Sequence, residues 1–260
     1  MLLTHQQTVS GARGRMGEFD SAFETALAEV EAAANFDALR VAVSRLLEPY
    51  NLKHAVYHAL RIPGAEKEHP FLVFTYPQEW IDRYFQKKYY NIDPVVIQGE
   101  RSMLPVDWST LDRSSAPVQA LFGEADDVGL GRQGLTFPIR GALGDSAIFT
   151  VTSNASTKEW EHTRLCYLRD MQILGNYIHA IALKLSGVKM PDYLARLSRR
   201  EKECLQLAAV GMTISTTADK LCLSDRVVRG YLDSARHKLE AVTKSQAVAK
   251  AIALGIVHPV

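Results

Sequence analysis

The sequence predicts an α+β protein of two domains, in which helices surround a small central antiparallel sheet and an all-α domain of four helices follows. Three observations support this fold class. The 260 residues are enough for two ordinary domains, each with its own core. Up to about residue 186, strand-like segments occur in runs between helical ones and do not alternate strictly with them. Beyond that point, four short helical patterns succeed one another with almost no strand character.

Helical periodicity dominates the first domain. Apolar residues recur at three- and four-residue spacing from Phe19 to Pro49, which indicates two helices or one kinked helix. Ser156 and Glu159 have the capping-box pattern that opens a long amphipathic helix. The expected helical segments are 19–50, 77–90, 116–127 and 156–186.

Strands are expected where short runs are rich in β-branched and aromatic residues and are bounded by Pro or Gly. Such runs occupy residues 53–61, 71–76, 135–139 and 146–153. The turn-like segment "RGALGD" separates the last two runs. These strands are expected to form the small sheet.

The chain is expected to divide near Lys189. The polar, Gly-rich start of the chain and the segment "SGVKMPDYL" both lack helical periodicity. The expected parts are a flexible N-terminus (1–16), a first domain (17–186), a linker (187–194) and a second domain (195–260). The physiological start is left open between Met1 and Met16.

Composition and charge are typical of a soluble cytoplasmic protein without membrane contact. No stretch is long and apolar enough for a signal peptide or a membrane-spanning helix. The net charge of +1 is unevenly distributed, because 11 Lys and Arg face 7 Asp and Glu from Asp192 onward. Such asymmetry is expected when only this end meets a polyanion. The three cysteines, Cys166, Cys204 and Cys222, are expected to be buried thiols in a reducing compartment.

The stretch "GLGRQG" (129–134) fits the pattern G-x-G-x-x-G of dinucleotide-binding proteins. That pattern requires a strand before it and a helix after it, so that the helix N-terminus points at the pyrophosphate. Here a helix precedes it and a strand follows, and Pro138 forbids a helix there. The glycines are therefore expected to supply positive φ angles in a helix-to-strand turn.

Two other motifs suggest enzymes but lack the residues that catalysis needs. "GDSA" (144–147) is similar to a hydrolase serine block, yet it lies in a strand-to-strand turn without a partnering Asp-x-x-His. His54 and His58 are four residues apart on a predicted strand, too far apart to hold one zinc ion, and no third ligand is evident. The sequence therefore predicts no enzymatic activity, no metal and no cofactor.

The second domain has the spacing of a helix-turn-helix. Its helices are expected to begin at Ser198, Thr213, Ser224 and Thr243, with capping boxes at the first and last. In such a motif the second helix of the pair lies in the major groove of DNA. Four basic residues lie on that helix and its continuation: Arg226, Arg229, Arg236 and Lys238. Arginine can clamp guanine and lysine neutralises phosphate, although a basic helix is often only a solvated face.

This segment resembles the DNA-binding domain of the LuxR family. The matching residues are the opening "LSRREKECL", Gly211, Lys238-Leu239 and the last helix "QAVAKAIALG". The resemblance implies double-stranded DNA as a partner, structural roles for Glu201, Leu205 and Gly211, and Arg229 as the best candidate for a base contact. The chain departs from the residues usual in the family at Thr217, Val227-Val228 and Tyr231, so the DNA sequence that it reads is left open.

Aromatic residues gather around one aspartate in the first domain. Trp80 and Tyr84 are four residues apart on one helix face, and Tyr76 lies one turn before them. Asp93 precedes a proline in the same aromatic neighbourhood. An aromatic stripe is usually core, but a carboxylate among such residues must find hydrogen-bond donors or raise its pKa. The N–H of a ligand amide is one such donor.

Here the chain resembles the acyl-homoserine-lactone-binding domain of LuxR-type quorum-sensing receptors. The matching residues are Tyr76, Trp80, Tyr84, Asp93-Pro94, Pro105, Trp108 and Gly134. With the C-terminal match, the resemblance covers nearly the whole chain from about Phe19. It implies an αβα sandwich with a buried pocket between the sheet and one helix layer.

The residue types suit the ligand that this resemblance implies. Trp80 would donate its indole N–H to the lactone carbonyl, and Asp93 would accept the amide N–H. Tyr76 would donate to the acyl carbonyl, helped by Thr150. Trp108, Tyr84 and strand aliphatic residues would form the walls around the lactone and the acyl chain.

The sequence thus predicts a homodimeric transcription factor that binds an N-acyl-homoserine lactone and DNA, with RNA polymerase as a further partner. One alternative is a LuxR-type regulator that responds to another small molecule or binds DNA without ligand. A second is an enzyme that acts on the lactone, which would need an activated nucleophile that the sequence lacks. Acyl-chain length and oxidation, the operator and the sign of regulation are left open.

Overall fold

The computed structural model describes residues 19–62, 72–141, 144–187 and 197–259. The chain separates into two compact units, and the main division between them falls after Val188. The expected flexible N-terminus and all of the expected linker except Gly187 lie outside the described residues. Among the described helices, none has both the length and the apolar character needed to cross a membrane.

A five-stranded sheet forms the centre of the first unit, with strand order β2-β1-β5-β4-β3 and antiparallel pairing throughout. The strands are β1 (His54–Arg61), β2 (Leu72–Phe74), β3 (Val106–Asp107), β4 (Gln133–Arg140) and β5 (Ser146–Ser153). Thr150 of β5 pairs with Val56 on one side and Thr136 on the other. The four predicted strands are confirmed, whereas β3 is too short to show the alternation on which a prediction rests.

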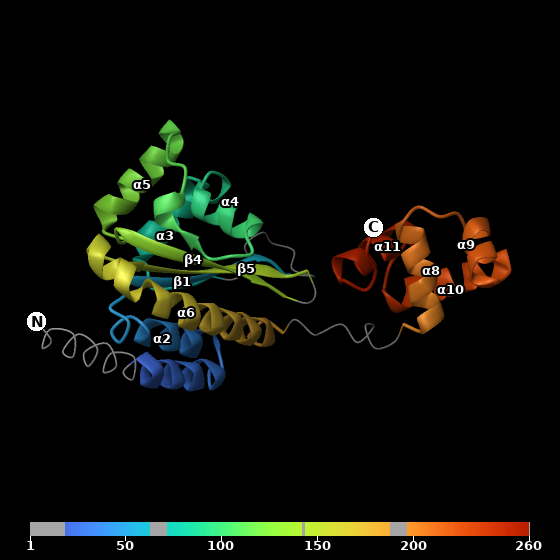
Figure 1. Cartoon of the computed structure of the whole chain (residues 1–260), viewed down its shortest axis with the longest axis horizontal. Coiled ribbons are helices and arrows are strands. Elements are labelled where there is room, and N and C mark those ends of the chain that lie inside the picture. The colour runs from blue at the N-terminus through green and yellow to red at the C-terminus, as the bar shows by residue number, and fades with distance from the viewer. Residues whose placement is uncertain (1–18, 63–71, 142–143, 188–196, 260) are drawn as a thin grey trace, which may run out of the picture. The chain divides into compact units, whose positions relative to one another are not determined.

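Helices cover both faces of this sheet (Figure 1). They are a segment at 19–31, α2 (Phe36–Arg45), α3 (Gln78–Gln86), α4 (Pro94–Arg101), α5 (Ala116–Val128) and α6 (Thr157–Leu185). The first predicted helical stretch is two helices, because the Asn35 side chain caps α2 by accepting the Ala38 N–H at 2.8 Å. The predicted capping box of Ser156 and Glu159 is present at the start of α6.

The segment that follows β2 differs from the single helix expected over 77–90. Pro77 is the N-cap residue of α3, and the helix stops at Gln86 because Lys88 adopts a left-handed conformation with φ of 53°. The sequence analysis also missed α4, whose eight residues are too few for a clear periodic pattern. Its start is nevertheless encoded, since Asp93 is the N-cap and Pro94 occupies the first turn.

The two faces of the sheet have different neighbours, because side chains alternate along each strand. Tyr57, Phe137 and Phe149 are fully buried in the main core, together with residues of α2 and α6. Val56 and Thr150 face the other way, toward the layer of α3, α4 and α5. Figure 1 shows the two helical layers on opposite sides of the sheet, which confirms the αβα sandwich.

The glycine-rich stretch 129–134 is the predicted turn from helix to strand. Gly129 ends α5 with φ of 73°, and Gly131 has φ of 118°. Gly134 differs from the prediction, because it lies within β4 and its φ is not positive. A Cβ atom at Gly134 would come within 2.3 Å of the indole ring of Trp108, so this position requires glycine for close packing.

The described residues of the second unit form four helices, as predicted. They are α8 (Arg199–Ala209), α9 (Ile214–Leu221), α10 (Asp225–Lys238) and α11 (Lys244–Ala253). Each N-cap side chain accepts the backbone N–H three residues on; the caps are Ser198, Thr213, Ser224 and Thr243. The capping box expected at Thr243 is incomplete, because the Gln246 side chain accepts the backbone N–H of Val242 and not that of Thr243.

The cysteines are less uniform than expected. Cys204 is buried and Cys166 is partly buried, but Cys222 is exposed. The prediction of a buried thiol is therefore wrong for Cys222, which ends α9 in a left-handed conformation with φ of 53°.

Glu201 joins α8 to α10 in the second unit. Its side chain is buried and accepts hydrogen bonds from Lys238 Nζ at 2.8 Å and from the Ser234 hydroxyl at 2.6 Å. It also accepts the backbone N–H of Ser198, which completes the capping box. Burial alone would raise the pKa of Glu201, but these donors bring it down to about 2. The structural role that the resemblance implied for Glu201 is present.

We expect Glu201→Gln to destabilise the second unit by about 2–3 kcal/mol at pH 7, because the partly exposed Lys238 loses the counter-charge of the buried carboxylate. Since the pKa is lowered in the folded state, this stabilisation is present above the ordinary value of 4.5 and is lost as pH falls toward about 2. Urea unfolding followed by circular dichroism measures it.

All three tryptophans lie in the first unit, at positions 80, 108 and 160, so tryptophan fluorescence provides the internal control. That signal should be unaffected by Glu201→Gln. A destabilisation that does not depend on pH would contradict the ionised pairing.

Candidate functional site

A cavity of about 80 Å³ lies between the sheet and the layer formed by α3, α4 and α5. All six residues predicted to contact a ligand line it: Tyr76, Trp80, Tyr84, Asp93, Trp108 and Thr150. The remaining lining residues are mostly aliphatic or aromatic. The structure therefore brings the predicted set together around one space.

α3 places Trp80 and Tyr84 on the face that lines the cavity. The two rings lie 6.1 Å apart between centroids, and Tyr89 packs against both. Trp80 is only 3% exposed, and its indole N–H donates to no other residue in the part of the chain that the structure describes. A donor of this kind is available to a molecule in the cavity.

Asp93 caps α4 and lines the cavity at the same time. Its Oδ1 accepts the Val95 N–H at 2.8 Å, and its Oδ2 accepts the Tyr84 hydroxyl at 2.7 Å. Burial raises the pKa of Asp93 above its ordinary value, and these hydrogen bonds oppose that effect only in part. Each carboxylate oxygen can accept a second hydrogen bond, so the group retains capacity for a further donor.

The two tyrosines of the site differ in their hydrogen bonding. The Tyr84 hydroxyl, expected only as a wall, donates to Asp93. Among the described residues Tyr76 has no hydrogen bond from its hydroxyl, although it lines the same cavity. Burial, and next the charge of Asp93, raise the pKa of both phenols, so both remain protonated donors.

A short chain of hydrogen bonds ends at the sheet side of the cavity. The Trp108 indole N–H donates to Thr136 Oγ1 at 3.0 Å, and the hydroxyls of Thr136 and Thr150 lie 3.0 Å apart. Trp108 thus has a fixed orientation over Gly134 as well as a wall position. Sequence reasoning missed Thr136, although a single polar residue inside the apolar strand "LTFPI" is a signal.

Other lining residues were also missed. His58 of β1, Leu121 and Phe122 of α5, and Leu130 of the following turn all line the cavity. Their apolar or strand positions look like ordinary core, so only the three-dimensional structure reveals them.

The four basic residues predicted to contact DNA fall into two pairs. Arg226 and Arg229 are exposed on the first two turns of α10. In contrast, Lys238 binds Glu201, and Arg236 donates to the Ala241 carbonyl at 3.2 Å. The structure gives Arg236 and Lys238 intramolecular partners, and the predicted DNA contacts of Arg226 and Arg229 stay predictions.

The motifs rejected as catalytic have structural explanations. His54 Nδ1 lies 3.0 Å from the Thr75 carbonyl oxygen, and burial lowers the pKa of this histidine. No group of three His, Cys, Asp or Glu that could hold a metal occurs among residues 19–62, 72–141, 144–187 and 197–259.

Comparison with known proteins identifies the family. Residues 35–182 match the family described as "Autoinducer binding domain", and residues 195–251 match "Bacterial regulatory proteins, luxR family". The chain belongs to the LuxR family. It is a ligand-responsive transcription regulator, and the LuxR family is one of regulators and not of enzymes.

Relatives within the LuxR family agree with this assignment. The transcriptional activator protein RaiR of Rhizobium etli is 42% identical over 71% of this chain and 76% of its own length. The quorum-sensing regulator RhlR of Pseudomonas aeruginosa is 33% identical over 70% of this chain and 74% of its own. The crystal structure of Escherichia coli SdiA aligns with a TM-score of 0.63 at 20% identity, covering 92% of this chain and 98% of SdiA, and confirms the fold.

We expect Tyr84→Phe to destabilise the ligand-free first unit by about 1–3 kcal/mol, because a buried carboxylate loses a charge-assisted hydrogen bond. Urea unfolding followed by tryptophan fluorescence measures the loss. Tyr177→Phe on α6 is the matched control, since Tyr177 is exposed and does not line the cavity. Equal effects of the two substitutions would show that the Tyr84–Asp93 contact has no energetic importance.

Proposed function

We propose that this protein binds an N-acyl-homoserine lactone in the cavity of its first unit and, as a homodimer, regulates quorum-sensing promoters through its second unit. Residues 17–186 would form the sensor domain and 195–260 the DNA-binding domain, joined by 187–194. The protein would act in the cytoplasm, where its DNA target lies, with RNA polymerase as a further partner.

One observation carries the ligand assignment. The Trp80 indole N–H, the Tyr76 hydroxyl and the Asp93 carboxylate all face the same largely apolar cavity. Two are donors without partners among the described residues, and the third is an acceptor whose pKa is raised by burial. A ligand with two carbonyls, one N–H and an apolar chain supplies the complementary groups, and an acyl-homoserine lactone is such a molecule.

In this arrangement the lactone carbonyl accepts from Trp80 and the amide N–H donates to Asp93. The acyl carbonyl accepts from Tyr76 and Thr150. Trp108 donates to Thr136, and the Thr136 and Thr150 hydroxyls share a hydrogen bond that either can donate. In this arrangement Thr136 would be the donor, so that the Thr150 hydroxyl hydrogen would reach the ligand. Ligand binding therefore satisfies polar groups that the protein alone leaves incomplete.

Ligand burial in this cavity would complete the core of the first unit. A ligand that binds the folded form and not the unfolded chain stabilises the folded form by mass action.

We expect the cognate lactone to raise the melting temperature of the first unit by several degrees at saturating concentration. Trp80→Phe should weaken lactone binding about 5- to 150-fold, because the lactone carbonyl loses its donor. Calorimetric melting and titration with a panel of lactones of different acyl length measure both effects.

Trp160→Phe is the matched control, because it removes an indole N–H from the main core on the other face of the sheet. It should leave lactone affinity unchanged. An unchanged wild-type melt across the whole panel would contradict the proposal. Mass spectrometry of ligand extracted from the purified protein would then identify the different small molecule of the alternative reading.

The DNA-binding proposal rests on the exposed basic residues of α10. Arg226 and Arg229 extend from the start of the helix that corresponds to the recognition helix. A homodimer would place two copies over half-sites about one helical turn apart. Gly230 leaves open space beside these arginines, since nothing lies within 4 Å of where its Cβ would be.

We expect Arg229→Ala to weaken binding to a duplex selected by the wild-type protein about 5- to 150-fold and to relax its sequence preference, because a bidentate base contact is lost. Arg226→Ala should reduce the slope of the logarithm of the binding constant against the logarithm of the salt concentration by about one. Fluorescence anisotropy at several salt concentrations measures both. Arg199→Ala, on an exposed arginine of α8 that pairs with Glu203, is the control. Losses no larger than this control would refute the assignment of α10.

A further inference from the structure

A second cavity adjoins the ligand cavity and shares part of its lining. It has a volume of about 130 Å³. Trp108, Phe122, Ala125 and Leu130 line both cavities, and we call these four side chains the partition. The second cavity differs chemically from the first, because its other lining residues include Arg113, Asp126 and Arg132.

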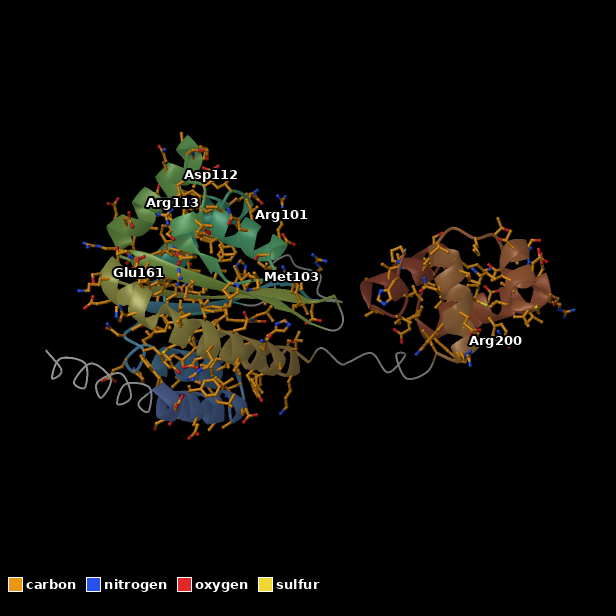
Figure 2. The ribbon with its side chains drawn as sticks, in the orientation of Figure 1. Arg101, Met103, Asp112, Arg113, Glu161 and Arg200 are labelled. Atoms are coloured by element: carbon orange, nitrogen blue, oxygen red, sulfur yellow. The ribbon has the colours of Figure 1, made fainter. Side chains whose placement is uncertain are left out.

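Arg113 lines the second cavity and contacts two members of the partition. Figure 2 shows this residue beside α5. Its guanidinium carbon lies 3.8 Å from the centroid of the Phe122 ring, a cation–π geometry. Its Nη2 donates a hydrogen bond to the Trp108 carbonyl at 3.1 Å. One side chain therefore contacts both aromatic members of the partition.

The two aromatic rings of the partition also depend on each other. Trp108 and Phe122 meet edge to face, with centroids 6.1 Å apart and an interplanar angle of 82°. Trp108 is additionally fixed by its bond to Thr136, but Phe122 is a partly buried side chain at the edge of its cluster. Phe122 is thus the member most dependent on Arg113.

The partition lies at the end of the ligand cavity where the lactone ring would be. Leu130 packs in the same apolar cluster as Trp80, whose N–H is the proposed donor to the lactone carbonyl. If the partition moved outward, the space beside the proposed position of the lactone ring would extend into the second cavity.

We propose that Arg113 is a positioning residue that keeps the partition closed and thereby restricts the ligand to a small head group, the five-membered lactone. This inference rests on the proposed function. It adds a selectivity determinant that does not touch the ligand, because Arg113 acts through Phe122 and Trp108. A larger ring would have to displace Phe122 and break its contact with the guanidinium.

The test compares two ligands that differ by one ring methylene. Both carry the acyl chain that gives the largest rise in melting temperature in the lactone panel. One has the five-membered homoserine lactone. The other has the six-membered δ-lactone of the amino acid whose side chain is one methylene longer than that of homoserine. Titration calorimetry gives the ratio of their dissociation constants. We expect wild-type protein to prefer the smaller ring about 10-fold or more, since one methylene in a shaped pocket has an effect of this order.

Arg113→Ala should reduce this preference to less than about 3-fold by improving the affinity for the larger ring. Arg113→Met keeps most of the side-chain volume, removes the guanidinium and should also reduce the preference. Arg132→Ala is the control, because Arg132 lines the second cavity but does not line the ligand cavity. A general loss of protein stability would weaken the binding of both ligands alike and would leave the ratio of their dissociation constants unchanged.

The outcomes separate the two proposals. If wild-type protein binds no lactone of the panel, the proposed function fails. If it binds them, but the ratio in a folded Arg113→Met or Arg113→Ala variant stays within 2-fold of wild type, the role of Arg113 is overturned. An equal change in Arg132→Ala would also overturn it, because the effect would then belong to the second cavity in general.

Discussion

The carboxylate of Asp93 is the group on which the rest of the proposed ligand site depends. Through one oxygen it begins α4, and through the other it holds Tyr84 of α3. Two helices of the same layer are thus fixed relative to each other by one side chain. Burial raises the pKa of Asp93, so every further donor that reaches it stabilises the ionised form. A ligand N–H would be such a donor, and it would bind the same carboxylate that contacts both α3 and α4.

The two faces of the sheet carry different kinds of residue. One face is filled by large aromatic residues such as Phe137 and Phe149, which are fully buried against α2 and α6. The other face carries smaller or polar residues where the ligand would lie. α4 approaches this face closely, because a Cβ at Gly99 would come within 2.8 Å of Ile148. This close approach leaves no room for a larger residue at position 99, where α4 meets β5.

The sequence predicts most helix boundaries, because these are encoded locally. Capping residues such as Ser156 and Ser198 lie within three residues of their partners, so their pattern is visible in one dimension. The same locality explains the failures. α4 and β3 are too short to show periodicity, and the helix after Pro77 ends early because Lys88 takes a left-handed conformation that its residue type does not announce.

The residues of the proposed ligand site could be predicted from the family resemblance, but their hydrogen bonds to one another could not. Tyr84 was expected as a wall, and only the structure shows that its hydroxyl bonds Asp93. Thr136 and Arg113 form hydrogen bonds with a residue outside their own elements, so the sequence does not show which partner each one has. In the second unit, Lys238 is of a residue type that often contacts phosphate, but it is paired with Glu201 on another helix. Residue type indicates what a side chain can do, and packing decides which partner it has.

The most direct test of the central claim is a thermodynamic cycle on the ligand amide and Asp93. The ligand is compared with its ester analogue, in which oxygen replaces the amide N–H, in wild-type protein and in Asp93→Ala. If the carboxylate accepts this N–H, the ester should bind wild type more weakly by about 1.5–3 kcal/mol, and the difference should vanish in the variant. The same amide–ester difference in both proteins would show that Asp93 does not receive the ligand.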